Sequence, residues 1–331
     1  MVTIDDVAKC AGVSKATVSR VLNNADMVSD KRRELVMDAI KRLKYEPNIA
    51  GRMLRKSETK SILVVFSVLI PEFMNAVTAE ADKAGYTILF YYSPAYIKNA
   101  KPLSPVYQGL VDGVILQDVM LDQKVLYDIM ERYPVVLCGG VMSFEGRDEN
   151  SIAIDNAVVA YNMTKHLIEK GKKRIGIVGI QLGGKVEPKF SRDREIGVRK
   201  ALAEAGIDMI DSLKYIGDVG YSTGREAAEY YMSLSQMPDA VFCFNDKIAI
   251  GCISAFKEKG LRVPEDIYVA GFDNLGITAQ FDPSISTVAQ PFNEMGELAV
   301  RRILSEIQGE LTEEVKIEGR IILRKSTDEE A

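Results

Sequence analysis

Residues 3–23, TIDDVAKCAGVSKATVSRVLN, are patterned as two short helices joined by a tight turn at the start of a 331-residue chain. Thr3, followed three residues later by Asp6, is a capping-box pattern that begins a helix. Gly12 can adopt the positive φ of a sharp turn, and Ser14 is a preferred cap for the second helix. The segment is therefore predicted to form a helix-turn-helix.

The second helix of this pair presents small, polar and basic side chains outward, because Val18 and Val21 mark its inner face. Such a helix fits the major groove, where an arginine can bind guanine bidentately. An ordinary surface helix hairpin is the alternative, since short helix pairs are common. The residues predicted to contact double-stranded DNA from this segment are Thr3, Ser14, Lys15, Ala16, Thr17, Ser19, Arg20 and Asn23.

The order of residues in this segment resembles that of the LacI/GalR family of transcriptional repressors. The resemblance continues through residues 28–55 and in further blocks, GYTILF (85–90), LVDGVIL (110–116), IAIDNAVVAYNMTKHLIEKGKKRIGIVG (152–179), REIGVRKAL (194–202), GLRVPEDIYVAGFDN (260–274) and ILRKST (322–327). It implies a homodimer that binds a pseudo-palindromic operator under the control of a small-molecule effector, in most relatives a sugar. Whether the effector releases the DNA or tightens its binding stays open.

Residues 48–55, NIAGRMLR, are too few to form a stable isolated helix in water. The resemblance implies a hinge helix that orders on DNA and inserts Leu54 into the central minor-groove step, where an apolar wedge bends the duplex. Gly51 stands where the family usually has alanine and costs about 0.5–1 kcal/mol of helix stability. A plain linker helix is the alternative. The hinge residues that the resemblance places at the DNA are Asn48, Ala50, Arg52 and Leu54.

After Lys60, short apolar and β-branched segments alternate with amphipathic helices. The strand candidates are residues 62–66, 87–92, 113–117, 134–138, 151–155, 174–179, 240–244 and 268–272. This alternation predicts doubly wound α/β folding with parallel sheets, behind an all-α headpiece. The predicted domains are the headpiece (1–47), the hinge and linker (48–60) and an effector-binding and dimerisation body (61–331). By resemblance the body has two lobes like a periplasmic binding protein, lobe one about 61–160 plus 291–320 and lobe two about 161–290 plus 321–331.

The resemblance places the effector in the cleft between the lobes, at the carboxyl ends of the strands. Asp273 and Arg194 match family residues that bind the effector, and a carboxylate with a guanidinium fork can hold a polyhydroxylated ligand from two sides. A simple helix cap is an equal alternative for Asp246, and a core position is the alternative for Phe73. The predicted effector-binding residues are Phe73, Arg194, Val219, Asn245, Asp246, Asp273 and Gln290.

The first lobe departs from the family pattern in three places. Gly139 and Gly140 stand where the family usually has Asp-Arg, so one expected cleft carboxylate is missing. The first helix of this lobe is about one turn shorter than usual. The next expected helix, residues 96–109, contains Pro102 and Pro105, which break helices. A changed ligand and a changed dimer contact both remain open.

The charge is divided unequally along the chain. Residues 1–60 contain 13 Lys and Arg against 8 Asp and Glu, whereas the whole chain carries a net charge of −5, so only the head suits a polyanion. There is no signal-peptide pattern and no apolar run of transmembrane length, which predicts a cytoplasmic protein without a membrane partner. Reduced, buried thiols are expected for the scattered cysteines, Cys10, Cys138, Cys243 and Cys252.

Catalytic and metal-binding interpretations find little support. His166 is the only histidine and lies in a helical pattern, so a structural polar role is favoured over a metal site. The glycines of residues 176–184 lack the Rossmann spacing. We therefore expect a protein that is not an enzyme, with no cofactor and no metal. A free-standing periplasmic-type binding protein and an α/β enzyme fused to a DNA-binding head are the competing classes.

Overall fold

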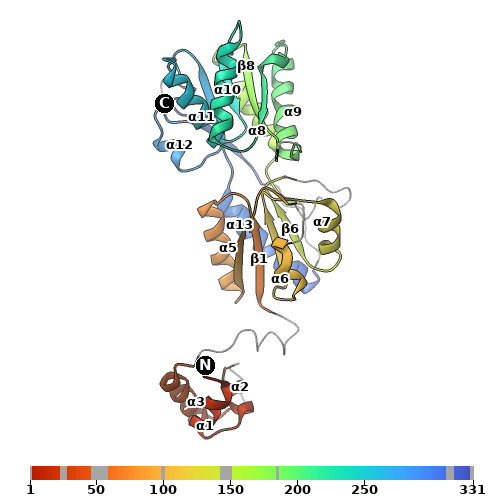
Figure 1. The fold of residues 1–331 in the computed structure, drawn as a ribbon, viewed down its shortest axis with the longest axis vertical. Coiled ribbons are helices and arrows are strands. Elements are labelled where there is room, and N and C mark those ends of the chain that lie inside the picture. Colours follow the sequence, from red (N-terminus) through yellow and green to blue (C-terminus); the bar gives the residue numbers. More distant parts are fainter. Residues whose placement is uncertain are drawn as a thin grey trace. The chain divides into compact units, whose positions relative to one another are not determined.

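The computed structural model describes residues 2–22, 28–45, 59–97, 101–141, 151–183, 186–310 and 317–328. The chain divides into two compact units, residues 1–59 and residues 60–331, each described by itself below (Figure 1). The predicted DNA contacts that lie outside the described residues are Asn23, Asn48, Ala50, Arg52 and Leu54.

The described part of the first unit contains three helices, α1 (Ile4–Ala11), α2 (Lys15–Leu22) and α3 (Asp30–Leu43). The predicted capping box is confirmed, because the Thr3 hydroxyl accepts a hydrogen bond from the Asp6 amide while the Asp6 carboxylate accepts from the Thr3 amide. Gly12 ends α1 in the left-handed region, and α2 begins three residues later. The helices enclose a small core that includes Val7, Val18, Val21, Val36, Ala39 and Tyr45.

Lobe one of the second unit is built from β1 (Ser61–Phe66), α5 (Pro71–Lys83), β2 (Thr87–Tyr92), β3 (Tyr96–Ile97), η1 (Lys101–Leu103), α6 (Ser104–Tyr107), β4 (Gly113–Gln117), β5 (Met120–Leu121), α7 (Gln123–Met130), β6 (Val135–Cys138), β7 (Ser151–Ile152) and α13 (Phe292–Gln308). Its main sheet has the described strands in the order β2-β1-β4-β6-β7, all parallel. Alternate residues of β1 face opposite sides. Ile62 and Val64 belong to the core that includes α5 and α13, whereas Leu63 and Val65 belong to the core that includes α6 and α7.

Lobe two is built from α8 (Asn156–Glu169), β8 (Ile175–Ile180), α9 (Lys189–Glu204), η3 (Asp211–Leu213), β9 (Lys214–Gly217), α10 (Tyr221–Ser233), β10 (Ala240–Cys243), α11 (Asp246–Glu258), β11 (Tyr268–Asp273), α12 (Ile277–Gln280), β12 (Ser286–Ala289) and β13 (Arg320–Ile322). The described strands of its sheet follow the order β13-β12-β11-β10-β8-β9, and β13 alone among them is antiparallel. Helix α8 packs against α9, and α10 packs against α11.

The chain passes between the lobes after β7, after β12 and after α13 (Figure 1). The first crossover lies at residues 153–155, because α8 packs mainly against α9, β12 and β13 of lobe two; the sequence placed this boundary at about residue 160. Ile154 forms a parallel bridge with Ile317, so the first and third crossovers lie side by side.

The predicted interruption of the helix at residues 96–109 is confirmed. The described part of this segment forms β3, the short 3₁₀ helix η1 and the single turn α6, with Pro102 in η1 and Pro105 at the start of α6. Within the described part of the chain, no helix is both long enough and apolar enough to span a bilayer.

Gly224→Ala is expected to destabilise the body by about 1–3 kcal/mol, the usual cost of overpacking. A Cβ at this position would overlap the carbonyl oxygen of Ile248, where α10 and α11 approach closely. Gly276→Ala is the control, since nothing lies within 4 Å of its added Cβ. Calorimetric unfolding should show a lower midpoint for the first variant only, and equal midpoints would contradict this account of the helix packing.

Candidate DNA-reading helix and effector cleft

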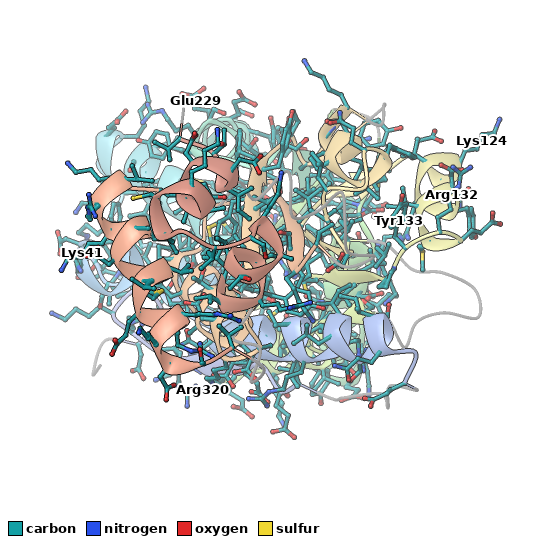
Figure 2. The ribbon with its side chains drawn as sticks, turned by 90° about the horizontal axis from the view of Figure 1, so that it is seen from below. Lys41, Lys124, Arg132, Tyr133, Glu229 and Arg320 are labelled. Carbon is teal, nitrogen blue, oxygen red and sulfur yellow. The ribbon has the colours of Figure 1, made fainter. Side chains whose placement is uncertain are left out.

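Helix α2 presents the predicted DNA contacts on its outer face. Lys15, Ala16 and Arg20 are exposed, whereas Val18 and Val21 are buried in the headpiece core. Ser14 begins the helix, with its hydroxyl accepting from the Thr17 amide at 3.2 Å, and Ser19 is half-buried. Exposed basic side chains of α3, such as Lys41, add positive charge to this unit (Figure 2).

One polar contact on this face is not evident from the sequence pattern. The Lys15 Nζ pairs with the Asp5 carboxylate of α1 at 2.8 Å, and about half of each side chain is exposed. Exposed ion pairs of this kind contribute about 0–1 kcal/mol, so a phosphate or a base edge can compete for Lys15. Thr3 uses its hydroxyl and its backbone amide in the capping box, which leaves its methyl group for a DNA contact.

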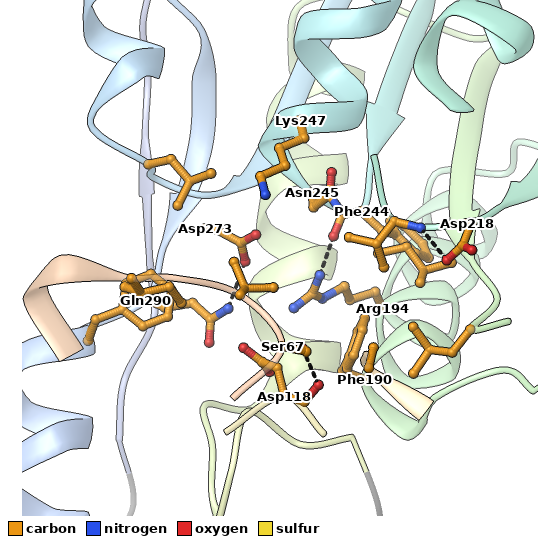
Figure 3. A pocket seen from close by; sticks show the side chains of 18 of the residues that line it. Ser67, Asp118, Phe190, Arg194, Asp218, Phe244, Asn245, Lys247, Asp273 and Gln290 are labelled. Carbon is orange, nitrogen blue, oxygen red and sulfur yellow. Dashed lines mark hydrogen bonds between the residues drawn. The ribbon is translucent and has the colours of Figure 1, made fainter. Parts of the chain in front are cut away.

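A cavity of about 280 Å³ lies between the two lobes (Figure 3). Lobe one contributes Ser67, Val68, Ile70, Tyr92, Ala95 and Asp118; lobe two contributes Ile180, Leu182, Phe190, Arg194, Asp218, Val219, Phe244, Asn245, Lys247, Asp273 and Leu275; the chain after β12 contributes Gln290 and Phe292. Most of these residues end or directly follow a parallel strand, which is where α/β sheets bind ligands. The volume suits a small polar molecule.

Five of the seven predicted effector residues line this cavity: Arg194, Val219, Asn245, Asp273 and Gln290. Phe73 does not, because its ring is completely buried between α5 and the sheet of lobe one, which was the alternative for this residue. Asp246 does not either. Its carboxylate is buried behind the cavity wall, and the cap of α11 is Asn245, whose side chain accepts from the Ile248 amide.

Arg194 is almost fully buried, 3% exposed, and several elements hold its guanidinium. Its Nε donates to Asn156 Oδ1 at 2.9 Å, another nitrogen donates to the Phe244 carbonyl, and the group stacks 3.3 Å from the Phe272 ring centroid. Burial lowers the pKa of Arg194 to about 10, against the opposing effect of Asp273 and Asp118. The group stays positively charged at neutral pH.

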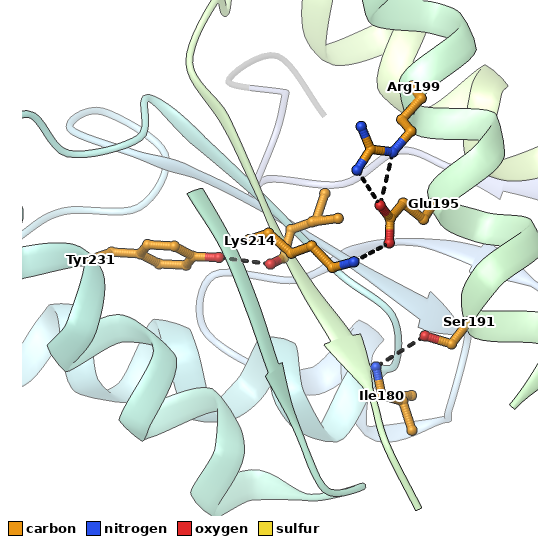
Figure 4. Close-up of polar contacts among 7 residues, drawn as sticks. Ile180, Ser191, Glu195, Arg199, Lys214 and Tyr231 are labelled. Atoms are coloured by element: carbon orange, nitrogen blue, oxygen red, sulfur yellow. Dashed lines mark hydrogen bonds and ion pairs between the residues drawn. The ribbon is translucent and has the colours of Figure 1, made fainter. Parts of the chain in front are cut away.

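Contacts on either side of Arg194 hold α9 in register with the sheet (Figure 4). Ser191 accepts a hydrogen bond from the Ile180 amide at 3.1 Å. Glu195 accepts from Lys214 of β9 and from Arg199, each at 2.6 Å. These contacts fix the helix position from which Arg194 enters the cavity.

Asp273 ends β11 and is held by a turn in the left-handed region, with φ of 112° at Asp273 and 57° at Asn274. Gln290 donates to Asp273 Oδ1 at 2.8 Å. Asp246 supports the turn from behind, since it accepts from the Leu275 amide at 2.7 Å and from the Thr287 hydroxyl at 2.6 Å. Asp246 is therefore a positioning residue for the cavity wall.

Asp118 is a cavity residue that the sequence reasoning missed. It follows β4 directly, and this place at the end of a buried parallel strand was a signal that could have found it. Burial raises the pKa of Asp118 to about 7, and the negative charge of Asp273 adds to the effect. Burial likewise raises the pKa of Asp273 to about 6, with Arg194 acting against it.

The remaining chemistry-bearing residues lie away from the cavity. His166 is buried with Nε2 3.2 Å from the Thr327 hydroxyl, and burial lowers its pKa. Across the described ranges, no group of three or more His, Cys, Asp and Glu side chains could hold a metal ion. The expectation of four buried thiols is wrong for Cys10, which is exposed on α1, and holds for Cys138, Cys243 and Cys252.

Known family models match parts of both units. Residues 3–48 match the family model described as bacterial regulatory proteins, lacI family, and residues 164–327 match a periplasmic binding protein-like domain. The HTH-type transcriptional regulator RegA of Clostridium saccharobutylicum is 34% identical, with 98% of this chain and 99% of that protein covered. The chain belongs to the lacI family of bacterial regulatory proteins.

Other transcriptional regulators match over nearly the same length. The HTH-type transcriptional repressor PurR of Photobacterium profundum is 33% identical, with 98% of each chain covered. A lac repressor dimer bound to operator and the anti-inducer ONPF superimposes with a TM-score of 0.84 at 27% identity, covering 98% of this chain and 99% of that one. A complex of the transcriptional regulator CelR with cellobiose gives a TM-score of 0.73 at 28% identity, covering 98% and 100%.

The raised pKa of Asp118 predicts a pH-dependent effect of Asp118→Asn on stability without any ligand. Between the ordinary value of 3.8 and about 7, the folded chain holds a proton that the unfolded chain has lost, so this carboxyl lowers stability as the pH rises. The amide has no such titration. The melting temperature of the variant minus that of the wild type should therefore increase from pH 5 to pH 8. A difference that stays constant or decreases would contradict the burial of this acid.

Proposed function

We propose that this lacI-family protein is a homodimeric transcriptional repressor. Two headpieces bind a pseudo-palindromic operator, with Lys15, Ala16 and Arg20 reading base edges and Leu54 wedging the central step. A small-molecule effector, most consistent with a sugar, binds the cleft and alters the affinity for DNA. The protein acts in the cytoplasm by binding alone, and the effector is a ligand and not a cofactor.

The observation that carries this proposal is that one chain combines α2, whose exposed face is small and basic, with a cavity lined by both polar and apolar groups at the strand ends of a two-lobed body. The first feature suits the major groove, and the second suits a small ligand that contacts both lobes. A coupling free energy of about 1–3 kcal/mol between the two sites would change DNA affinity severalfold to a hundredfold.

The exposed apolar side chains of the edge strand β2 favour a dimer contact at this strand. Leu89, Phe90 and Tyr92 are 38%, 42% and 67% exposed, and Leu69, which precedes α5, is 64% exposed. Strand β2 is the edge of its sheet, and large apolar side chains on such an edge are an unstable surface for a solitary molecule. We propose that this edge contributes to the contact between the two copies.

The DNA-binding half is tested by gel shift on a palindrome with a central CG step. Arg20→Ala should weaken binding and relax sequence choice, because an arginine–guanine pair is worth about 1–3 kcal/mol of discrimination. Lys56→Ala is the comparison, because we expect this basic residue after the hinge segment to bind a phosphate, and its removal should weaken binding to all sequences alike. Equal, sequence-blind losses would refute the role of Arg20. Absence of binding by the dimer even at low salt would refute the repressor.

The dimer is tested by Leu89→Lys. A charge in this edge should shift the molar mass in solution toward the monomer and weaken binding to a full palindrome at least tenfold, with little change on a half-site. Leu323→Lys is the matched control, since Leu323 is 36% exposed and follows β13 in lobe two. Light scattering and gel shifts give the two readouts, and a dimer that survives the first substitution would exclude β2 from the interface.

A further inference from the structure

Gly139 and Asp118 lie next to each other, and the Asp118 side chain fills the space beside Gly139. Gly139 follows β6 with φ of 98°, and a Cβ added to it would overlap Asp118 Oδ1. Asp118 follows the neighbouring strand β4, which pairs with β6 up to Gln117 and Cys138. The Asp118 side chain therefore fills the space into which a side chain at position 139 would project. The carboxylate missing after β6 is replaced by one from the adjacent strand.

The Asp118 carboxylate is held from one side by a hydrogen bond, and its residue lines the cavity. Gln117 Nε2 donates to Asp118 Oδ2, and the Ser67 hydroxyl donates to the Asp118 carbonyl oxygen at 2.6 Å. Among the described residues no hydrogen bond reaches Asp118 Oδ1, and the residue lines the cavity. A carboxylate oxygen in this position can accept a hydrogen bond from a ligand.

A second carboxylate, Asp273, faces the same cavity from lobe two (Figure 3). The positive charge of Arg194 acts on both acids and lowers the pKa of each relative to burial alone. The guanidinium donates to Asn156 and to the Phe244 carbonyl, and among the described residues it makes no hydrogen bond to either acid. A ligand that brings donors to both carboxylates would complete their hydrogen bonding.

We propose that Asp118 is the lobe-one carboxylate that selects the effector, and that the effector is a neutral or cationic molecule with a hydrogen-bond donor at each end, one for Asp118 and one for Asp273. Hydroxyl groups and a protonated amine share this chemistry. An anionic group at the Asp118 end is disfavoured above pH 7, where this carboxylate carries its charge. The inference rests on the proposed effector site and deepens it.

The test is calorimetric binding to the full-length dimer after a thermal-shift panel of neutral mono- and disaccharides, their amino derivatives, their phosphates and nucleosides. The neutral or amino compound that raises the melting temperature most is the probe. Above pH 7, where Asp118 is charged, Asp118→Asn should weaken its binding roughly ten- to a hundredfold, the cost of losing a hydrogen bond to a charged group. Asp122→Asn is the control, because Asp122 caps α7 outside the cavity and asparagine caps equally well.

If Asp118→Asn loses more affinity for an amino probe than for its hydroxyl counterpart, the amine is the donor to Asp118. Equal losses of affinity identify the hydroxyl as the donor. Unchanged binding in Asp118→Asn overturns the role of Asp118, while a probe that still shifts operator affinity leaves the proposed repressor intact. A panel in which only phosphates bind, or no compound binds, overturns the ligand class. Operator binding is measured on the same samples. Operator binding that persists shows that only the ligand class is wrong, whereas its absence contradicts the proposed repressor.

A second measurement needs no ligand. Gly139→Ala should lower the melting temperature less in an Asp118→Ala background than in the wild type, because removal of the carboxylate clears the overlapping space. The backbone strain of alanine at a positive φ is the same in both backgrounds and cancels. Equal decreases in melting temperature would show that Asp118 does not occupy the space beside Gly139. They would contradict the proposal that Asp118 replaces the carboxylate missing after β6.

Discussion

The guanidinium of Arg194 joins several parts of the body beside the cleft. It extends from α9, donates to Asn156 at the start of α8, donates to the carbonyl that follows β10, and stacks on Phe272 of β11. Because an unpaired buried cation is costly, these partners must be present together. The same charge then faces the two carboxylates of the cavity, so the packing of lobe two and the electrostatics of the ligand site share one residue.

The backbone conformation of the cavity wall determines where its two carboxylates, Asp273 and Asp118, lie. Asp273 is presented by a left-handed turn, and Asp246 holds that turn through the Leu275 amide and the Thr287 hydroxyl. Asp118 also lies in the left-handed region, with φ of 51°. Aspartate tolerates this conformation better than most residues, although it carries a cost. Both acids are thus held in position by surrounding contacts before any ligand arrives.

Much of the fold followed from local patterns. The capping box at Thr3, the turn at Gly12 and the prolines that interrupt residues 96–109 act through their nearest neighbours, so the sequence was sufficient to predict them. The buried strands were visible as β-branched runs. Strands β9 and β12 were missed, because KYIG and STVA are short and carry no strong alternation. Their strand character comes from pairing with β8 and β11.

The sequence by itself determined the helix-turn-helix, the α/β body and the family, because these depend on periodicity, caps and an ordered set of motifs. It also identified Arg194 and Asp273 as cleft residues. Only the tertiary structure decided that Phe73 is core, that Asp246 supports the cavity from behind, and that Asp118 occupies the space left by Gly139. The physical reason is that these roles depend on which strand ends meet across the sheet, and sequence spacing does not specify that proximity.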